Sequence, residues 1–152
     1  MKWKGVSRFK GPEQSPGFLL WRLSTDWRRQ IEAGLATLGL THPQFVLLAS
    51  VGWLTRDGQQ VTQVELARHC NTDINMTSQI LRTLERNGYI QRLPCKKDER
   101  SKLPCLTKSG AQLIQKSIPL VEGIDEKFFE ILKKTDIKKW MDISHALLDS
   151  RC

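Results

Sequence analysis

Apolar side chains recur at spacings of three and four positions along most of the chain, which predicts a largely helical protein. The first such segment runs from about residue 18 to residue 38, and Gly39 follows it as a stop. The second begins with Thr41 as a cap and Pro43 in its first turn, and it stays apolar until the polar break at residues 56–60. Both segments are expected to be helices.

A capping box predicts the start of a third helix. Thr62 and Glu65 have the required spacing, in which each side chain satisfies a free backbone N–H of the other residue. The apolar face of this short helix consists of Val64, Leu66 and Ala67. After a turn, a fourth helix is expected from about Asp73 to Asn87, where Gly88 ends it. Two helices joined in this way are typical of a helix-turn-helix, which places its second helix in the major groove of DNA.

Successive residues of the fourth helix lie about 100° apart around its axis, so apolar and polar positions fall on different sides. The side expected to pack on the third helix consists of Ile74, Thr77, Ile80, Leu81 and Leu84. The opposite side, called here the polar stripe, consists of Asn75, Gln79, Arg82 and Arg86, with Ser78 and Thr83 beside it. Such side chains contact base edges and phosphates, and both acids of this helix lie off the stripe. The pattern favours a helix that reads double-stranded DNA over an ordinary solvated face.

Two strand-like pieces, GYIQRLP and LPCLT, enclose the stretch CKKDERSK and predict a β-hairpin. Six of the eight residues in this stretch are charged, and four of them are basic. Proline has no N–H for a strand ladder, so Pro94 and Pro104 predict a hairpin that is short near them or turns their nitrogens outward. Two further helices are expected at about 108–121 and 123–149, with the break near Pro119 and Gly123. The fold class is therefore mainly α with a small β-hairpin.

Charge narrows the class of partner. The formal net charge is +8 and the pI is about 9.6, which favours nucleic acid first and an anionic membrane second. No apolar run reaches the roughly 20 residues of a membrane span, and the N-terminus has no apolar secretory segment. The cysteines are then expected to be reduced thiols of a cytoplasmic protein. Residues 1–16 are expected to be a flexible basic arm, and residues 17–150 a single folded unit.

The order and spacing of these pieces resemble the MarR family of winged helix-turn-helix transcriptional regulators over roughly residues 18–148. The resemblance rests on GLTHPQFVLL, VTQVELARHC, TSQILRTLERNGYIQR and the wing KKDERSKLPCLTKSG. Its most specific part is Asp98 and Arg100 followed by Leu106, Thr107 and Gly110. It implies a winged helix-turn-helix at about residues 41–107, and dimerisation helices at about 18–38 and 108–149.

The resemblance assigns roles to the charged hairpin tip. In the family the wing reaches the minor groove beside the major-groove helix. Arg100 is thus implied to enter that groove, whose negative potential is enhanced in A·T-rich segments, and Asp98 to hold its guanidinium in place. Phosphate contacts are implied for Lys96, Lys97 and Lys102. Gln79 stands where many members carry arginine, which favours adenine over guanine.

The resemblance also implies a homodimer that places two recognition helices on a pseudo-palindromic operator. The terminal helices supply apolar side chains for such an interface, among them Phe18, Leu19, Leu23, Phe128, Phe129, Trp140, Met141, Ile143, Leu147 and Leu148. In the family, small aromatic acids or other phenolics bind between the dimerisation helices and the DNA-binding part. The candidates for such a pocket here are Trp21, Trp27, His42, Phe45 and Trp53. The expected function is a ligand-responsive repressor of transcription.

Other functions stay open at this point. A thiol-based redox regulator would use Cys95 and Cys105, which are equidistant from the wing tip and are expected to face each other across the hairpin. A DNA-binding protein without a regulatory role, or an enzyme, is less favoured. His69 and Cys70 are adjacent on a helix and point about 100° apart, and the chain lacks phosphate-loop and nucleophile-elbow motifs. Histidines and cysteines are too scattered to predict a metal site, and no cofactor is expected.

Overall fold

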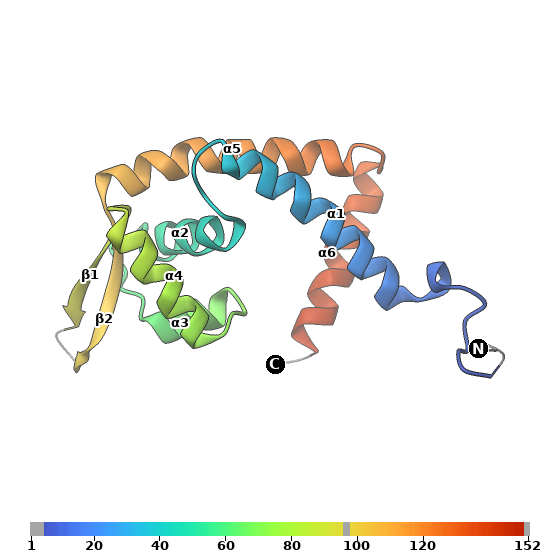
Figure 1. Cartoon of the computed structure of the whole chain (residues 1–152), viewed down its shortest axis with the longest axis horizontal. Helices are drawn as coiled ribbons and strands as arrows, with labels where there is room; N and C mark the ends of the chain where they lie inside the picture. Colours follow the sequence, from blue (N-terminus) through green and yellow to red (C-terminus); the bar gives the residue numbers. More distant parts are fainter. Residues whose placement is uncertain (1–4, 96–97, 151–152) are drawn as a thin grey trace.

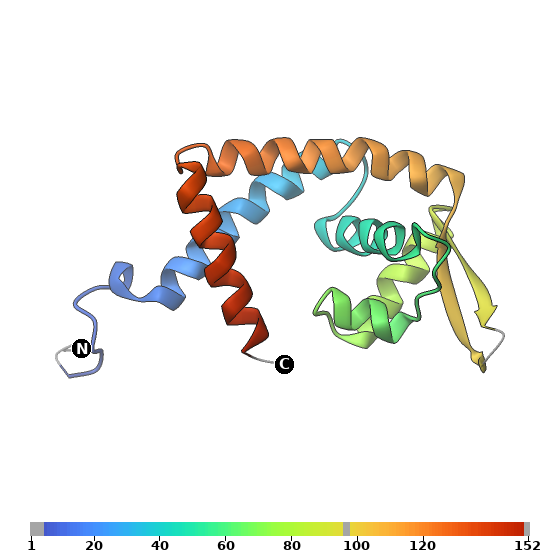
Figure 2. The ribbon, with the colours of Figure 1, turned by 180° about the vertical axis from the view of Figure 1, so that it is seen from behind.

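The computed structural model describes residues 5–95 and 98–150, which form six α-helices, a short 3-10 helix and one two-stranded antiparallel sheet. In chain order the elements are η1 (Pro12–Gln14), α1 (Pro16–Ala36), α2 (His42–Thr55), α3 (Gln63–His69), α4 (Ile74–Arg86), β1 (Ile90–Cys95), β2 (Asp98–Leu106), α5 (Lys108–Phe129) and α6 (Lys134–Asp149). Helices α2, α3 and α4 and the β1–β2 hairpin form a compact lobe beneath one end of α5, while α1 and α6 lie toward its other end (Figures 1 and 2). The predicted class, mainly α with a small β-wing, is confirmed.

The predicted capping box is present at α3, and the predicted cap Thr41 forms a second one at α2. The Thr41 hydroxyl accepts the backbone N–H of Gln44 at 3.4 Å, and the Gln44 side chain accepts that of Thr41 at 3.0 Å. Thr62 and Glu65 make the same pair of bonds at 3.2 and 2.7 Å. These bonds satisfy N–H groups that have no partner within the helix, so they define where α2 and α3 begin.

Helix α1 and a short element before it lie at the N-terminal end of the described chain. Helix α1 begins at Pro16, because the Ser15 side chain accepts the backbone N–H of Phe18 at 3.4 Å. Before it, the 3-10 helix η1 forms within the expected arm and contacts α1. Residues 1–4 of the arm lie outside the described residues.

The predicted break at Pro119 and Gly123 is wrong, because α5 continues through both residues to Phe129. Their side of the helix is exposed, whereas Ser117 and Val121 on the other side are buried. Proline removes one hydrogen bond of the helix ladder, and here the buried contacts on either side of it keep the helix intact. The chain turns instead between α5 and α6, at residues 130–133.

Two groups of buried side chains make up the core. The lobe is filled by Leu47, Leu48, Val51, Val61, Leu66, Leu81, Leu84 and Ile90. A second group, where α1 meets α5, consists of Ile31, Leu35, Leu40 and Val121. Leu113 of α5 packs against both groups and so connects the lobe to α1.

Two residues predicted to pack inside the lobe lie on its surface. Val64 is 50% exposed, because the short helix α3 buries only one side, which carries Leu66 and Ala67. Ile74 is 43% exposed, because the contact of α4 with the core begins one turn further on, at Thr77. The first turn of α4 therefore projects beyond the core.

The end of α4, both strands and the start of α5 meet at one junction. Gly88, with φ of 76°, turns the chain from α4 into β1 in a conformation that glycine adopts without strain. Its carbonyl accepts hydrogen bonds from the Thr107 hydroxyl at 2.6 Å and the Ser109 hydroxyl at 2.7 Å. Thr107 also caps α5 by accepting the N–H of Gly110 at 3.1 Å. Gly110 lies so close to the Tyr89 carbonyl that a Cβ atom would overlap it.

An ion pair joins α4 to the wing. The Arg92 guanidinium of β1 donates from Nε to the Glu85 carboxylate of α4 at 2.8 Å, and it donates a second bond from Nη2. The Arg92 side chain is only 16% exposed, so this pair is held within the structure and differs from a mobile surface pair. Hydrogen bonds from Arg92 hold the pKa of Glu85 below its ordinary value.

The close approach at Gly110 gives a prediction for stability. Gly110→Ala should lower the free energy of unfolding by about 1–3 kcal/mol, because the new methyl group forces α5 away from Tyr89. The control is Gly123→Ala in the same helix, where the added Cβ meets nothing within 4 Å. That change should leave stability unchanged or raise it by up to about 1 kcal/mol. Urea denaturation followed by circular dichroism measures both, and equal effects at the two positions would contradict the packing at the junction.

The ion pair gives a prediction that depends on pH. A carboxylate whose pKa is lowered by folding contributes stability above its unfolded pKa, about 4.3, and loses that contribution as the pH falls through the lowered value. Glu85→Gln should therefore destabilise the protein by at most about 1 kcal/mol at neutral pH, since the carboxylate is partly solvated. The difference from the parent should shrink as the pH falls below about 4.3 and vanish once the carboxylate is protonated in the folded protein as well.

The matched control for this pair is Glu32→Gln. Glu32 pairs with Arg28 at 3.7 Å on the surface of α1, where both side chains are more than half exposed. Its substitution should change the free energy of unfolding by less than about 0.5 kcal/mol at either pH. A Glu85→Gln deficit that persists unchanged in acid would show that the ion pair is not its cause.

Candidate nucleic-acid interface

The polar stripe of α4 lies on the surface as predicted. Asn75, Gln79, Arg82 and Arg86 are all exposed, and the opposite side of the helix is buried in the core. Ser78 and Thr83 are half-buried beside the stripe. The Thr83 hydroxyl donates to the carbonyl of Gln79 at 3.2 Å, within the helix. Chemically, the stripe offers amide and guanidinium groups toward solvent with no carboxylate among them.

The turn before α4 fixes how this stripe is presented. Asn71 has a left-handed φ of 50°, a conformation that asparagine tolerates better than most residues. The Asp73 carboxylate caps α4 by accepting the backbone N–H groups of Asn75 at 2.8 Å and Met76 at 3.1 Å. The Thr77 hydroxyl, fully buried, donates to the Asp73 carbonyl at 2.9 Å. The helix therefore starts from a turn whose hydrogen bonds are internal.

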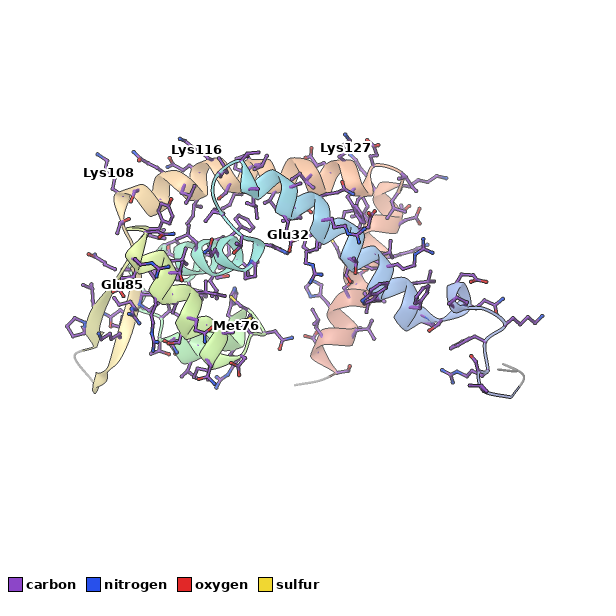
Figure 3. The ribbon with its side chains drawn as sticks, in the orientation of Figure 1. Glu32, Met76, Glu85, Lys108, Lys116 and Lys127 are labelled. Carbon is purple, nitrogen blue, oxygen red and sulfur yellow. The ribbon has the colours of Figure 1, made fainter. Side chains whose placement is uncertain are left out.

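The wing lies beside α4, on the side of the Glu85–Arg92 pair (Figures 1 and 3). Leu103 and Pro104 of β2 are buried and anchor the base of the wing on the lobe. Lys102 is exposed, and its backbone pairs with Pro94 of β1. The ladder continues through both prolines, so the hairpin does not shorten near them, and it becomes irregular after Pro94.

The remaining wing residues of the sequence prediction are described only in part. Lys96 and Lys97 lie outside the described residues. The backbone of Asp98 and Arg100 belongs to β2, and their side chains lie outside the described part of the chain. Their implied contacts with DNA therefore stay predictions.

The expected pairing of Cys95 with Cys105 is wrong. The strand register pairs Cys105 with Gln91, and Cys95 with Asp98. Four positions along a strand separate Gln91 from Cys95, a distance of about 13 Å, which is too long for a disulfide. Cys105 is a free thiol. The regular part of the ladder is centred on residue 98, whereas the two cysteines are equidistant from residue 100, so they do not face each other and the redox alternative is not supported.

Three of the five expected pocket residues come together where α1 meets α2. The rings of Trp27 and His42 make an edge-to-face contact with centroids 5.1 Å apart, and Trp27 and Phe45 pack on the same buried group. Trp27 Nε1 also donates to Asp125 Oδ1 of α5 at 2.7 Å. Burial lowers the pKa of His42, which keeps its imidazole neutral near neutral pH.

The other two tryptophans lie elsewhere. Trp21 is 62% exposed on α1, where it stacks on Phe18. Trp53 is 59% exposed at the end of α2, under the guanidinium of Arg56 at 3.8 Å from the ring centroid. These five candidates were chosen for their aromatic character alone, which provides no basis for separating them.

Sequence reasoning did not single out Arg92 and Asp125, which make hydrogen bonds next to the polar stripe and the Trp27 cluster. Each bonds to a residue of another element: Arg92 to Glu85, seven positions away, and Asp125 to Trp27, 98 positions away. A hollow of about 530 Å³ opens beside Trp27 and Asp125, between α1, α5 and α6. Apart from Asp125 and Ser24 its lining is apolar, with Leu20, Leu23, Phe128, Phe129, Ile131, Leu132 and Trp140.

None of the helices in the described ranges 5–95 and 98–150 combines the length and apolar character of a membrane span. The arrangement of the surface is instead that of a helix-turn-helix with an adjacent wing. In chemical terms it presents hydrogen-bond donors and positive charge to a partner.

Comparison with known proteins agrees with this geometry. Residues 40–102 match the model of the MarR family. An uncharacterised HTH-type transcriptional regulator of Bacillus subtilis, YdcH, is 42% identical over 136 residues, which cover 90% of this chain and 91% of YdcH. The HTH-type transcriptional repressor Rv2887 of Mycobacterium tuberculosis is 31% identical over 111 residues, which cover 73% of this chain and 77% of the repressor.

Solved structures give the same result. A crystal structure of a MarR mutant from E. coli, complexed with operator DNA, has a TM-score of 0.78 at 25% identity and covers 87% of this chain and 92% of that one. The complex of Rv2887 with salicylic acid has a TM-score of 0.65 at 28% identity and covers 88% and 96% of the two chains. With this sequence identity along nearly the whole length, and with the helix-turn-helix and wing in place, the chain belongs to the MarR family of transcriptional regulators.

Proposed function

We propose that this protein is a homodimeric repressor that reads a pseudo-palindromic operator with α4 and the wing, and that a small aromatic or phenolic compound regulates it. The observation that carries the proposal is the polar stripe, a row of exposed amides and guanidinium groups without a carboxylate. Its helix is capped by Asp73 at the start and paired with the wing through Glu85 and Arg92 near the end. The MarR mutant that was solved with operator DNA shares this fold along most of its length, which supports the same ligand here.

The residues of the stripe favour particular base pairs. Asparagine and glutamine pair best with adenine, and arginine pairs best with guanine or binds phosphate. Asn75 and Gln79 lie nearer the N-terminus of α4, which enters the groove most deeply, and Arg82 and Arg86 follow toward its C-terminus. We therefore assign base reading to the amides and to Arg82, and phosphate contact to Arg86.

The wing supplies the second contact in this proposal. Arg100, held by Asp98, enters the flanking minor groove, and Lys96, Lys97 and Lys102 lie near phosphates. The Glu85–Arg92 pair fixes the wing relative to α4, so contacts in the two grooves keep a constant spacing. The net charge of +8 favours rapid, salt-dependent association with DNA.

Exposed apolar side chains on α1 and α6 support a dimer. Helix α6 buries none of its residues in the single chain, and it exposes Trp140, Met141, Ile143, Leu147 and Leu148 by 40–60%. Helix α1 likewise exposes Phe18, Leu19, Leu20, Trp21 and Leu23. Apolar surface of this extent is characteristic of an interface, and a second copy of the chain presents the same surfaces.

Two observations support a repressor that responds to an effector: what is known of the relatives, and the cluster of Trp27, His42 and Phe45. Rv2887 is named a repressor, and it was solved with salicylic acid. Here Trp27, His42 and Phe45 lie where α1, α2 and α5 meet, so a ligand bound there would bear on the lobe and the dimer helices together. Because the relatives compared are transcriptional regulators, we propose that this protein is not an enzyme. We also propose that it acts in the cytoplasm, where the chromosome lies.

The recognition helix gives a direct test. Gln79→Ala and Arg82→Ala should each weaken binding to the preferred operator by about 1–3 kcal/mol, and should weaken binding to random duplex much less, because base contacts carry discrimination. Fluorescence anisotropy, at one salt concentration and with a site selected from random duplexes, provides the measurement.

Lys116→Ala serves as the control for the charge that Arg82→Ala removes. Lys116 lies on the outer side of α5, away from α4 (Figure 3). Its substitution should leave both affinities unchanged within about twofold. Equal losses on operator and random duplex in the α4 variants would show that the stripe does not read bases.

The dimer is tested by charge placed on α6. The double variant Ile143→Lys with Leu147→Lys should be monomeric at micromolar concentration and should bind the operator at least about tenfold more weakly, since charge at an apolar interface is costly. The control is Asp142→Lys with His145→Lys, which adds lysine to the opposite side of the same helix. Sedimentation velocity measures the mass. A first variant that stays dimeric and binds normally would refute the interface.

A further inference from the structure

Two apolar side chains are exposed in the first turn of α4. Ile74 is 43% exposed and Met76 is 41% exposed, although the rest of this helix separates apolar from polar residues cleanly. In Figure 3, Met76 lies at the end of α4 opposite to Glu85, and so far from the ion pair that holds the wing. Ile74 and Met76 lie on either side of Asn75 in sequence and flank it around the helix.

The backbone that carries these side chains is fixed. Asp73 accepts the N–H of Met76 at 3.1 Å, and the Gln63 side chain of α3 donates to the Ile74 carbonyl at 3.3 Å. The core contacts of α4 begin only at Thr77. These hydrogen bonds hold the first turn in place, with both side chains partly exposed at the surface of the lobe.

A single exposed apolar residue is ordinary on protein surfaces. Two of them in the turn that enters the major groove meet a specific set of chemical groups. The N-terminal residues of a recognition helix contact base edges, and the only apolar group that the major groove presents is the C5-methyl of thymine. An adenine read by an amide such as Asn75 also brings a thymine methyl within the same base pair.

We propose that Ile74 and Met76 contact thymine C5-methyl groups in the major groove, and that they select thymine at the positions next to the bases read by the polar stripe. The inference rests on the proposed function, since it concerns the same interface. It adds specificity-determining residues that donate and accept no hydrogen bond through their side chains, and that respond to one methyl group on the DNA.

The experiment changes that methyl group alone. Each thymine of one selected half-site is replaced in turn by deoxyuridine, which keeps every hydrogen-bonding group and lacks the methyl. At one or two positions the parent protein should bind about three- to fivefold more weakly, the effect of losing one buried methyl. At those positions Ile74→Ala or Met76→Ala should bind the thymine and deoxyuridine duplexes within about twofold of each other.

Val64→Ala is the matched control, because Val64 is 50% exposed and apolar but belongs to α3. It should keep the full sensitivity of the parent to deoxyuridine. The inference is overturned if the parent binds every deoxyuridine duplex within twofold of the thymine duplex. It is also overturned if the α4 variants lose as much affinity as the parent does when thymine is replaced by deoxyuridine. A protein that selects no site at all would overturn the proposed function as well, so the two failures are distinct.

Discussion

The carbonyl group of Gly88 is the point on which the arrangement of the DNA-binding surface depends. It accepts hydrogen bonds from two hydroxyls, those of Thr107 and Ser109, where the wing ends and α5 begins. The neighbouring carbonyl of Tyr89 accepts the N–H of Thr107 at 3.1 Å and leaves no room for a side chain at Gly110. The recognition helix, both strands and α5 therefore share one fixed point. In the proposed repressor, this junction would connect a displacement of α5 directly to the exposed side of α4.

Much of this fold follows from local sequence signals. The two capping boxes and the glycine after α4 are decided within a few residues, so the sequence places these boundaries well. The break expected at Pro119 and Gly123 was wrong because both signals describe local preference, whereas the continuity of α5 is decided by buried contacts at Ser117 and Val121. Likewise the equal spacing of the two cysteines from residue 100 suggested that they face each other, but the strand register is centred on residue 98 and places Cys105 opposite Gln91.

The exposed polar side of α4 was predictable because helical periodicity alone determines it. The sequence could not show which end of that helix packs on the core, because this depends on where α3 ends in space. Ile74 was predicted to be buried for that reason, and it is exposed. The partners Glu85 with Arg92 and Trp27 with Asp125 were beyond sequence reasoning as well. Each pair joins different elements, and no spacing rule relates residues that meet only through tertiary structure.

The prolines of the wing also bear on self-association. A two-stranded sheet has two edges; here β2 packs against α2 and α3, and β1, which touches α4, forms the outer strand of the wing (Figure 1). Proline is compatible with a ladder when its nitrogen faces away from the paired strand, so at Pro94 the outer edge lacks the N–H that a docking strand needs. An incoming strand from another molecule would lose a hydrogen bond at that position. The proline therefore makes the outer strand of the wing a poorer template for pairing with another molecule.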